Sequence, residues 1–302
     1  MRVEARLAEN PGTELLGATL CVPDLQQAMA FYGNILGQVL VSEGLVGELE
    51  ALAWDAPAMR GAACCLLRPP RNAPVFLRLV QATHPADYEP GRHFGWNALE
   101  FSVADADTLH ELVADHGLKI LSPPECLEIS NDLYALQAKG FAGEWLRFIQ
   151  ILRPSTVSDL PVARCKVDRV FIAVLANHNQ IESIRYYNRL LDLETGGNWN
   201  CAYQIISEAF VLPSETFHRF STCRSGRNVL LEVDQYPRQG RAKPRAPASL
   251  NPSIALVSVL VSRPPEAALW LSLPRVRTEM PYCGRTVEVP RGPDGELLEI
   301  VW

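Results

Sequence analysis

The stretch Gly17–Gly37, GATLCVPDLQQAMAFYGNILG, carries the pattern that decides the fold of this 302-residue chain. A short apolar run, Ala18–Val22, precedes a turn at Pro23-Asp24. Apolar residues then recur at the spacing of one buried helix face, at Leu25, Ala28, Met29, Tyr32 and Leu36. Asp24 stands at the N-cap position, where its carboxylate can accept a hydrogen bond from the first helical turn, and Gly37 is the stop signal. The stretch therefore predicts a strand, a tight turn and an amphipathic helix.

Composition places the chain among globular proteins and excludes several kinds of partner. The sequence is 48% hydrophobic and 21% charged, and it is long enough for two domains. A net charge of −6 disfavours nucleic acid, which requires a basic face. No apolar run approaches the ~20 residues that span a bilayer, and the charged N-terminus lacks the core of a signal peptide. The 8 cysteines lack metal-binding spacing. We therefore expect a cytoplasmic protein with reduced cysteines, bound to neither nucleic acid nor membrane.

The opening pattern returns three times along the chain. Unit one ends on the apolar run Val75–Gln81, and three further units follow it: unit two at Trp96–Gln150, unit three at Asp168–Asp234 and unit four at Ile254–Val301. The segment Arg153–Ala163 is rich in proline and serine and has the composition of a linker. A repeat of this kind outweighs any single helix assignment. We therefore predict an N-terminal domain at 1–152 from units one and two, a linker at 153–163, and a C-terminal domain at 164–302 from units three and four.

Two motifs resemble a known superfamily. The first is formed by Val22-Pro23-Asp24-Leu25, Ala28, Phe31-Tyr32 and Leu36-Gly37, and the second is the closing run Pro293–Glu299, PDGELLE. Both resemble the βαβββ module of the vicinal oxygen chelate superfamily, which includes glyoxalase I, bleomycin-resistance proteins and ring-cleaving extradiol dioxygenases. Four units in one chain resemble the layout of the dioxygenases. The resemblance implies an α+β fold in which four βαβββ modules pair into two cup-shaped, half-barrel domains.

The resemblance also implies a metal site, and this chain departs from it. Members of the superfamily hold a divalent metal through His or Gln on the first strand of a module and Glu on the last strand, and the metal polarises two adjacent substrate oxygens. The corresponding first-strand positions here are Gly17, about Ala98, Arg169 and near Ala255, none of them histidine. The last-strand positions are Arg78, Arg147, Glu232 and Glu299. An ordinary Fe²⁺-dependent ring-cleaving dioxygenase is therefore not expected.

Strand alternation predicts that these four charged side chains point into the cups. With consecutive units paired, the N-terminal cup receives Arg78 and Arg147, and the C-terminal cup receives the two glutamates. Two guanidinium groups repel a cation, so we expect no metal in the N-terminal cup. The arginines would instead hold a carboxylate ligand, or pair with acidic neighbours such as Glu100.

Three interpretations remain open for the C-terminal cup. Arg169 could pair with both Glu232 and Glu299 and stand where the metal would be, since a guanidinium forks carboxylates well. Alternatively, the two carboxylates hold a divalent metal in a degenerate site, although Fe²⁺ and Zn²⁺ favour nitrogen ligands. In the third interpretation a carboxylate acts as a general base without metal. We expect no cofactor, with a divalent metal in the C-terminal domain as the alternative.

Other residues complete the set of candidates. His218, on a predicted strand between Phe217 and Phe220, and Tyr282 are candidate polar groups near the carboxylates, as His and Tyr are in the dioxygenases. Trp145 is a candidate wall for a planar ligand. Tyr32 and Tyr187 are predicted to pack their helices against the sheets.

Two classes of function stay open, because fold alone does not decide between them. One is a metal-independent enzyme of lyase, isomerase or oxygenase type, acting on a small aromatic or carboxylate-bearing molecule. Its catalytic candidates are Glu299, Glu232, His218 and Tyr282, and its ligand-binding candidates are Arg78, Arg147, Arg169 and Trp145. The alternative is a non-catalytic binding or resistance protein of the bleomycin-resistance type. Four units complete two cups in one chain, so a homodimer is compatible with the sites but not required.

Overall fold

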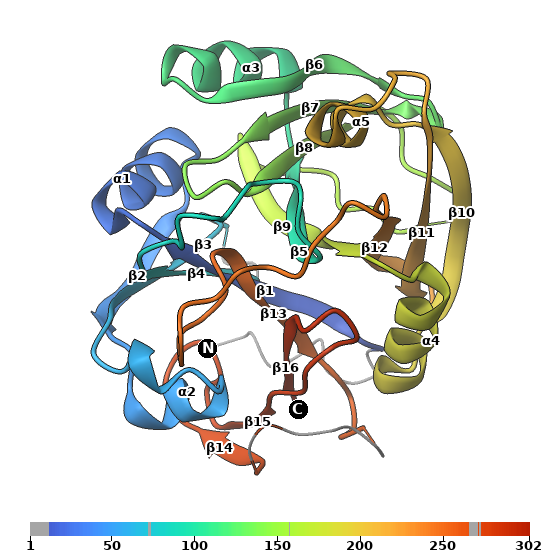
Figure 1. Ribbon diagram of the computed structural model, residues 1–302. Helices are drawn as coiled ribbons and strands as arrows, with labels where there is room; N and C mark the ends of the chain where they lie inside the picture. The colour runs from blue at the N-terminus through green and yellow to red at the C-terminus, as the bar shows by residue number, and fades with distance from the viewer. Residues whose placement is uncertain (1–11, 72–73, 157, 266–270, 272) are drawn as a thin grey trace.

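The computed structural model describes residues 12–71, 74–156, 158–265, 271 and 273–302. Its strands form two curled sheets, one above the other in Figure 1. The first sheet is ordered β14 (Arg275–Arg277), β15 (Arg285–Glu288), β16 (Leu297–Val301), β13 (Ser253–Leu260), β1 (Glu14–Val22), β4 (Phe76–Gln81), β3 (Ala63–Arg68) and β2 (Val39–Leu45). The second is ordered β10 (Glu194–Ala202), β11 (Phe217–Ser225), β12 (Asn228–Gln235), β9 (Val167–Asn177), β5 (Gly95–Val103), β8 (Trp145–Ile151), β7 (Ser130–Lys139) and β6 (Lys119–Leu127). The α+β fold with two cup-like sheets is confirmed.

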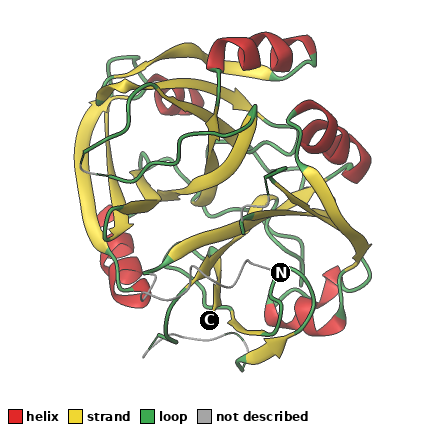
Figure 2. Cartoon of the chain, turned by 180° about the vertical axis from the view of Figure 1, so that it is seen from behind, coloured by secondary structure: helices red, strands yellow, loops and turns green. Residues whose placement is uncertain are grey.

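Helices are short and lie beside the sheets (Figure 2). They are α1 (Leu25–Met29), the π-helical turn η2 (Ala30–Ile35), α2 (Glu48–Ala53), the 3₁₀ turn η3 (Pro57–Met59), α3 (Ala106–Asp115), α4 (Gln180–Leu191) and α5 (Gln204–Phe210). Asp24 caps α1, and its carboxylate accepts from the Gln27 amide at 2.9 Å. The chain turns at Gly37 with φ +80°, a conformation that glycine adopts readily. Both signals predicted from the sequence are confirmed. No helix among the described residues is long and apolar enough to cross a membrane.

The sheets join unit one to unit four and unit two to unit three. Strand β1 runs antiparallel to β13, with Gly17 opposite Ser258, and β5 runs antiparallel to β9, with Ala98 opposite Val174. Each sheet is therefore built around the first strands of two units. These four strands are almost entirely buried, so their edges need hydrogen-bonding partners within the protein.

This pairing differs from the pairing of consecutive units expected from the sequence. The two sheets do not follow the predicted domains 1–152 and 164–302. The predicted linker, 153–163, connects β8 to β9, and both strands belong to the second sheet. Proximity along the chain favoured consecutive units, but the pairing of strand edges decides which units share a sheet.

Two buried tyrosine–glutamate contacts connect the sheets. Tyr32 in η2 donates to Glu144 Oε1 at 2.6 Å, and Tyr187 in α4 donates to Glu296 Oε1 at 2.6 Å. Both tyrosines are buried, as predicted for helix packing, but their hydrogen bonds were not foreseen. Burial raises the pKa of Glu144 and of Glu296 to about 7. Equivalent contacts thus link unit one to unit two and unit three to unit four.

Gly17 is required by close packing in the first sheet. It lies beside Phe76 in the parallel pairing of β1 with β4. A Cβ atom at Gly17 would lie 2.4 Å from the Phe76 carbonyl oxygen, far inside van der Waals contact. The absence of a side chain at this position therefore has a structural reason.

Candidate functional site

Each sheet carries one arginine and one glutamate at the predicted last-strand positions. Arg78 on β4 and Glu299 on β16 lie in the first sheet, and Arg147 on β8 and Glu232 on β12 lie in the second. We call the regions around these two pairs the first cup and the second cup. The expected distribution, with both arginines in one cup and both glutamates in the other, is wrong because unit one pairs with unit four and unit two with unit three.

Arg78 is the centre of the first cup. Its Nη1 donates to Thr19 Oγ1 at 3.1 Å, and its Nη2 donates to the Tyr282 hydroxyl at 2.5 Å. The guanidinium also lies 3.6 Å from a Glu50 carboxylate oxygen and 3.9 Å from one of Glu299. Burial lowers the pKa of Arg78, but the interaction with the Tyr282 hydroxyl and the charges of Glu50 and Glu299 raise it by more. Arg78 therefore stays a cation inside the cup.

Glu299 is held entirely by protein groups. Its Oε1 accepts from Tyr282 at 2.7 Å and from the Trp54 indole at 3.4 Å, and its Oε2 accepts from Ser258 at 2.6 Å. The tyrosine hydroxyl thus bridges Arg78 and Glu299, and burial raises the pKa of Tyr282 well above its usual value. Tyr282 was predicted to lie near the carboxylates, and it contacts Glu299. Both carboxylate oxygens of Glu299, however, already accept hydrogen bonds from protein groups.

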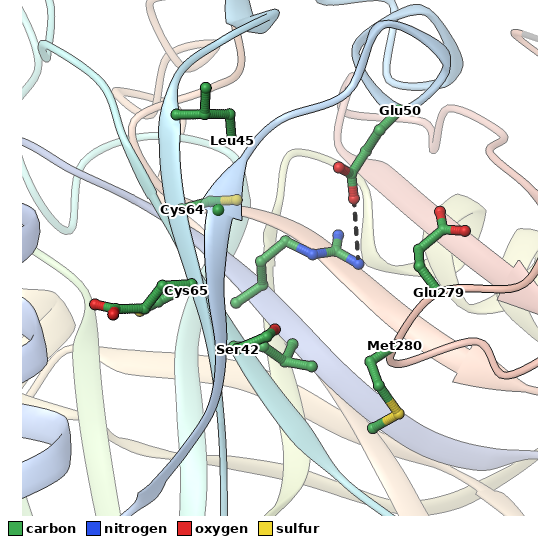
Figure 3. Close-up of a pocket in the computed structure, with 11 residues that line it drawn as sticks. Ser42, Leu45, Glu50, Cys64, Cys65, Glu279 and Met280 are labelled. Carbon is green, nitrogen blue, oxygen red and sulfur yellow. Dashed lines mark ion pairs between the residues drawn. The ribbon is translucent and has the colours of Figure 1, made fainter.

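A cavity of about 160 Å³ opens beside Arg78. Its wall includes Ser42, Glu50, Cys64, Arg78, Glu279 and Met280. Figure 3 shows the ion pair from Glu50 to the guanidinium, with Glu279 and Met280 on one side and Ser42 and Cys64 on the strands opposite. Burial and the charge of Glu50 raise the pKa of the Cys64 thiol, which keeps it protonated. The cavity therefore offers a ligand one cation, Arg78, and three carboxylates, Glu43, Glu50 and Glu279, of which Glu50 pairs with Arg78 and Glu279 with Arg277.

The second cup is built around Arg147. Its Nη1 donates to Glu100 Oε1 at 2.9 Å and to Glu232 Oε1, and its Nη2 donates to Asp234 Oδ2 at 3.2 Å. The Tyr203 ring lies over the guanidinium, 5.3 Å from its carbon. The expected pairing with Glu100 is confirmed. Asp234 was missed, although its place two residues after Glu232 on one strand puts it on the same face.

Negative charge exceeds positive charge in the second cup. One guanidinium faces three carboxylates, and the Arg147 side chain is only 6% exposed. Burial and the charge of Glu232 raise the pKa of Glu100 to about 7, which outweighs the opposite effect of Arg147. Burial likewise raises the pKa of Asp234. The cluster therefore retains protons at pH values where isolated carboxylates would have lost them.

The predicted cluster of Arg169 with Glu232 and Glu299 does not form. The two glutamates lie in different sheets, and each pairs with another arginine. Arg169 lies near the start of β9, half-buried, and makes no ion pair with either glutamate in the described structure. On the first strands, Thr19 and Glu100 contact the arginines, whereas Gly17 and Ala98 lie two residues away.

The remaining candidates lie in packed surroundings. His218 is buried and shares a 2.9 Å hydrogen bond with Ser207 of α5, so it attaches that helix to β11. Burial lowers the pKa of His218, which favours the neutral ring. Trp145 is buried in a hydrophobic cluster with Phe171, Tyr236 and others. Neither residue lines the cavity at Arg78.

A second cavity of about 320 Å³ lies outside both cups. Its wall includes Gln180, Asn198, Asn200, Arg219 and Ser221. Asn198 pairs with Ser221, and Thr222, the next residue, pairs with Glu232. Because neighbouring residues of a strand face opposite sides, this cavity opens on the face away from Arg147 and Glu232.

Comparisons with known proteins agree with the fold. The model of the Glyoxalase/Bleomycin resistance protein/Dioxygenase superfamily matches residues 15–126. Glyoxalase I from Zea mays is similar in structure, with 15% identity, a TM-score of 0.61 and coverage of 96% of this chain and 92% of that one. A putative dioxygenase from Bacillus subtilis subsp. subtilis str. 168 has 12% identity, a TM-score of 0.61 and coverage of 97% and 86%. A search of curated proteins finds no match. The family model thus covers residues 15–126 of the chain, and the solved structures show that the chain shares this fold over nearly its whole length.

Proposed function

We propose that this protein binds a small organic molecule in the first cup, without a metal ion. The observation that carries the proposal is the cavity of about 160 Å³ that opens onto Arg78 and Glu50. A guanidinium beside a carboxylate can donate to one ligand group and accept from another. A carboxylate or carbonyl next to a hydroxyl or amine satisfies both. The volume is below the ~300–1,000 Å³ of drug-sized sites, which favours a ligand of few atoms.

The donor groups of the cups do not fit a divalent metal. Glu299 faces the guanidinium of Arg78, and Glu232 faces that of Arg147, so a metal ion beside either glutamate would meet a fixed positive charge. In the described part of the chain, no three His, Cys, Asp or Glu residues are grouped to hold a metal. Fe²⁺ and Zn²⁺ also favour nitrogen ligands, and no histidine contacts these carboxylates among the described hydrogen bonds and ion pairs. We therefore infer that the arginines replace the metal.

Binding without turnover is favoured over catalysis by the state of the predicted base. Glu299 accepts hydrogen bonds on both oxygens and is not part of the cavity wall. A metal-independent lyase or isomerase would instead need Glu50, the carboxylate that pairs with Arg78 and reaches the cavity. That enzyme is the second candidate function. We place either function in the cytoplasm, where the eight free cysteines would stay reduced.

Ligand binding tests the proposal directly. Small probes such as lactate, benzoate and glycine are titrated against the purified protein by thermal shift, alongside native mass spectrometry for co-purified molecules. We expect saturable stabilisation by at least one carboxylate probe, its loss in Arg78→Met, and its retention in Arg153→Met. Arg153 is a matched control because its ion pair with Asp132 is exposed.

Metal analysis provides the opposing outcome. We expect dialysis against EDTA to leave probe binding unchanged. One equivalent of a divalent metal, removed by EDTA together with probe binding, would contradict the proposal. Turnover of a bound probe that disappears in Glu50→Gln, while binding persists, would favour the enzyme.

A further inference from the structure

Arg147 is surrounded in the way that a bound cation would be. Three carboxylates from two strands meet its guanidinium, Glu100 on β5 and Glu232 and Asp234 on β12, where the latter two are successive positions of one face; Arg147 itself lies on β8. Two of them contact Nη1 and one contacts Nη2, whereas Nε has no hydrogen-bond partner among the described groups. The contacts are therefore all to the end of the side chain, the part that a free guanidinium ion shares.

The cluster also has capacity beyond what one arginine fills. Asp234 is 1% exposed, and its Oδ1 has no partner in the described structure. Three ionised carboxylates against one guanidinium would leave an excess of negative charge, and the raised pKa values of Glu100 and Asp234 reduce that excess by keeping protons in the cluster. A buried carboxylate without enough positive charge nearby is costly, so this arrangement strongly favours a cation at its centre.

The cup is closed over this cation. Tyr203 lies on the guanidinium and donates its hydroxyl to Gln137 at 3.1 Å. Helix α5 begins directly after Tyr203, and Ser207 of that helix is hydrogen-bonded to His218 on β11. While the Arg147 side chain is in place, it fills the space between the carboxylates and leaves no room there for a cation from solution.

We propose that the second cup is a guanidinium-binding site that the chain occupies with its own Arg147, and that a free alkylguanidinium takes this place when the side chain is shortened. This inference does not depend on ligand binding in the first cup. In this view the cation of the second cup is the chain's own Arg147, and a ligand from solution would bind only in the first cup.

Chemical rescue tests the inference. Arg147→Ala is compared with wild type by thermal unfolding, with and without millimolar methylguanidinium chloride. We expect a large loss of melting temperature in the variant, restored in a saturable way by methylguanidinium. N-methylurea has nearly the same shape without the charge, so it should restore nothing. Wild type and Arg153→Ala should not respond to either compound.

Several outcomes would overturn the inference. One is an Arg147→Ala protein as stable as wild type, and another is a destabilised variant that methylguanidinium does not restore or that N-methylurea restores equally. If Arg147→Ala does not fold, Arg147→Lys and Arg147→Met are compared instead. A folded lysine variant beside an unfolded methionine variant supports the need for a cation, whereas equal behaviour of the two contradicts it.

Discussion

The two cups use an arginine at the same position of the last strand for different purposes. Arg78 in the first cup faces Glu50 and Glu299 and borders a cavity, and the Tyr282 hydroxyl is hydrogen-bonded to both Arg78 and Glu299. In the second cup, Arg147 faces three carboxylates and lies beneath an aromatic ring. The comparison teaches that an arginine at the same strand position can border a cavity or lie inside a closed ion cluster, depending on which charged side chains meet it.

The largest effect on the free energy of unfolding is expected when Arg78 and Arg147 are removed, and the two losses should differ. Arg147→Met leaves three buried carboxylates without a cation, and we expect a loss of about 3–5 kcal/mol in the free energy of unfolding. Arg78→Met should cost about 1–3 kcal/mol, because Glu299 keeps its donors Tyr282, Ser258 and Trp54. Urea unfolding of both variants checks this order. Equal losses would remove the distinction between the cups.

The stability of the second cup should depend on pH. A carboxyl such as Glu100, whose pKa is about 7 when folded, retains its proton better in the folded state. Its contribution to stability is complete below the unfolded pKa of about 4.5 and is lost as the pH rises through 7. We expect wild type to lose roughly 2–3 kcal/mol relative to Glu100→Gln between pH 5 and pH 8.

Urea unfolding of both proteins across this range measures that difference. The exposed substitution Glu215→Gln serves as the control and should leave the slope of stability against pH unchanged. A difference between wild type and Glu100→Gln that stays constant with pH would show that Glu100 keeps no extra proton in the folded protein.

The two equivalent tyrosine–glutamate hydrogen bonds should contribute equally to the free energy of unfolding. Tyr32→Phe and Tyr187→Phe each remove a 2.6 Å hydrogen bond to a buried glutamate, and we expect each to cost about 1–2 kcal/mol. Thermal unfolding of the two variants measures the costs. Clearly different stability losses in the two variants would mean that the two contacts are alike in geometry but not in energy.

The smallest effect is expected at the ring that covers Arg147. Tyr203→Phe removes the hydroxyl bond to Gln137 but keeps the ring over the guanidinium, so the cost should be about 1 kcal/mol. Probe binding in the first cup should not change. Weaker probe binding in this variant, measured by the same titration, would show that the cups are coupled.

Much of the fold could be predicted, because its signals are local. The cap at Asp24 and the stop at Gly37 depend on bonds within a few residues, and each is found in the structure. The charged residues of buried strands also face the cups, as alternation requires. The pairing of Arg147 with Glu100 was predicted, whereas the pairings of Arg78 with Glu299 and of Arg147 with Glu232 were not, and Arg169 was assigned to a cluster that does not form.

The sequence by itself determined the four repeated units, the helix cap at Asp24 and the arginines in the last strands of units one and two, Arg78 and Arg147. Only the tertiary structure decided that β1 pairs with β13 and β5 with β9, and thereby that Arg78 meets Glu299 and Arg147 meets Glu232. The physical reason is that a cap is satisfied within one turn of chain, whereas the partner of a strand edge is chosen by the burial of two distant segments at once. The sequence therefore shows where a charged residue stands in a strand, but the residue with which it forms an ion pair is known only once the sheet has assembled.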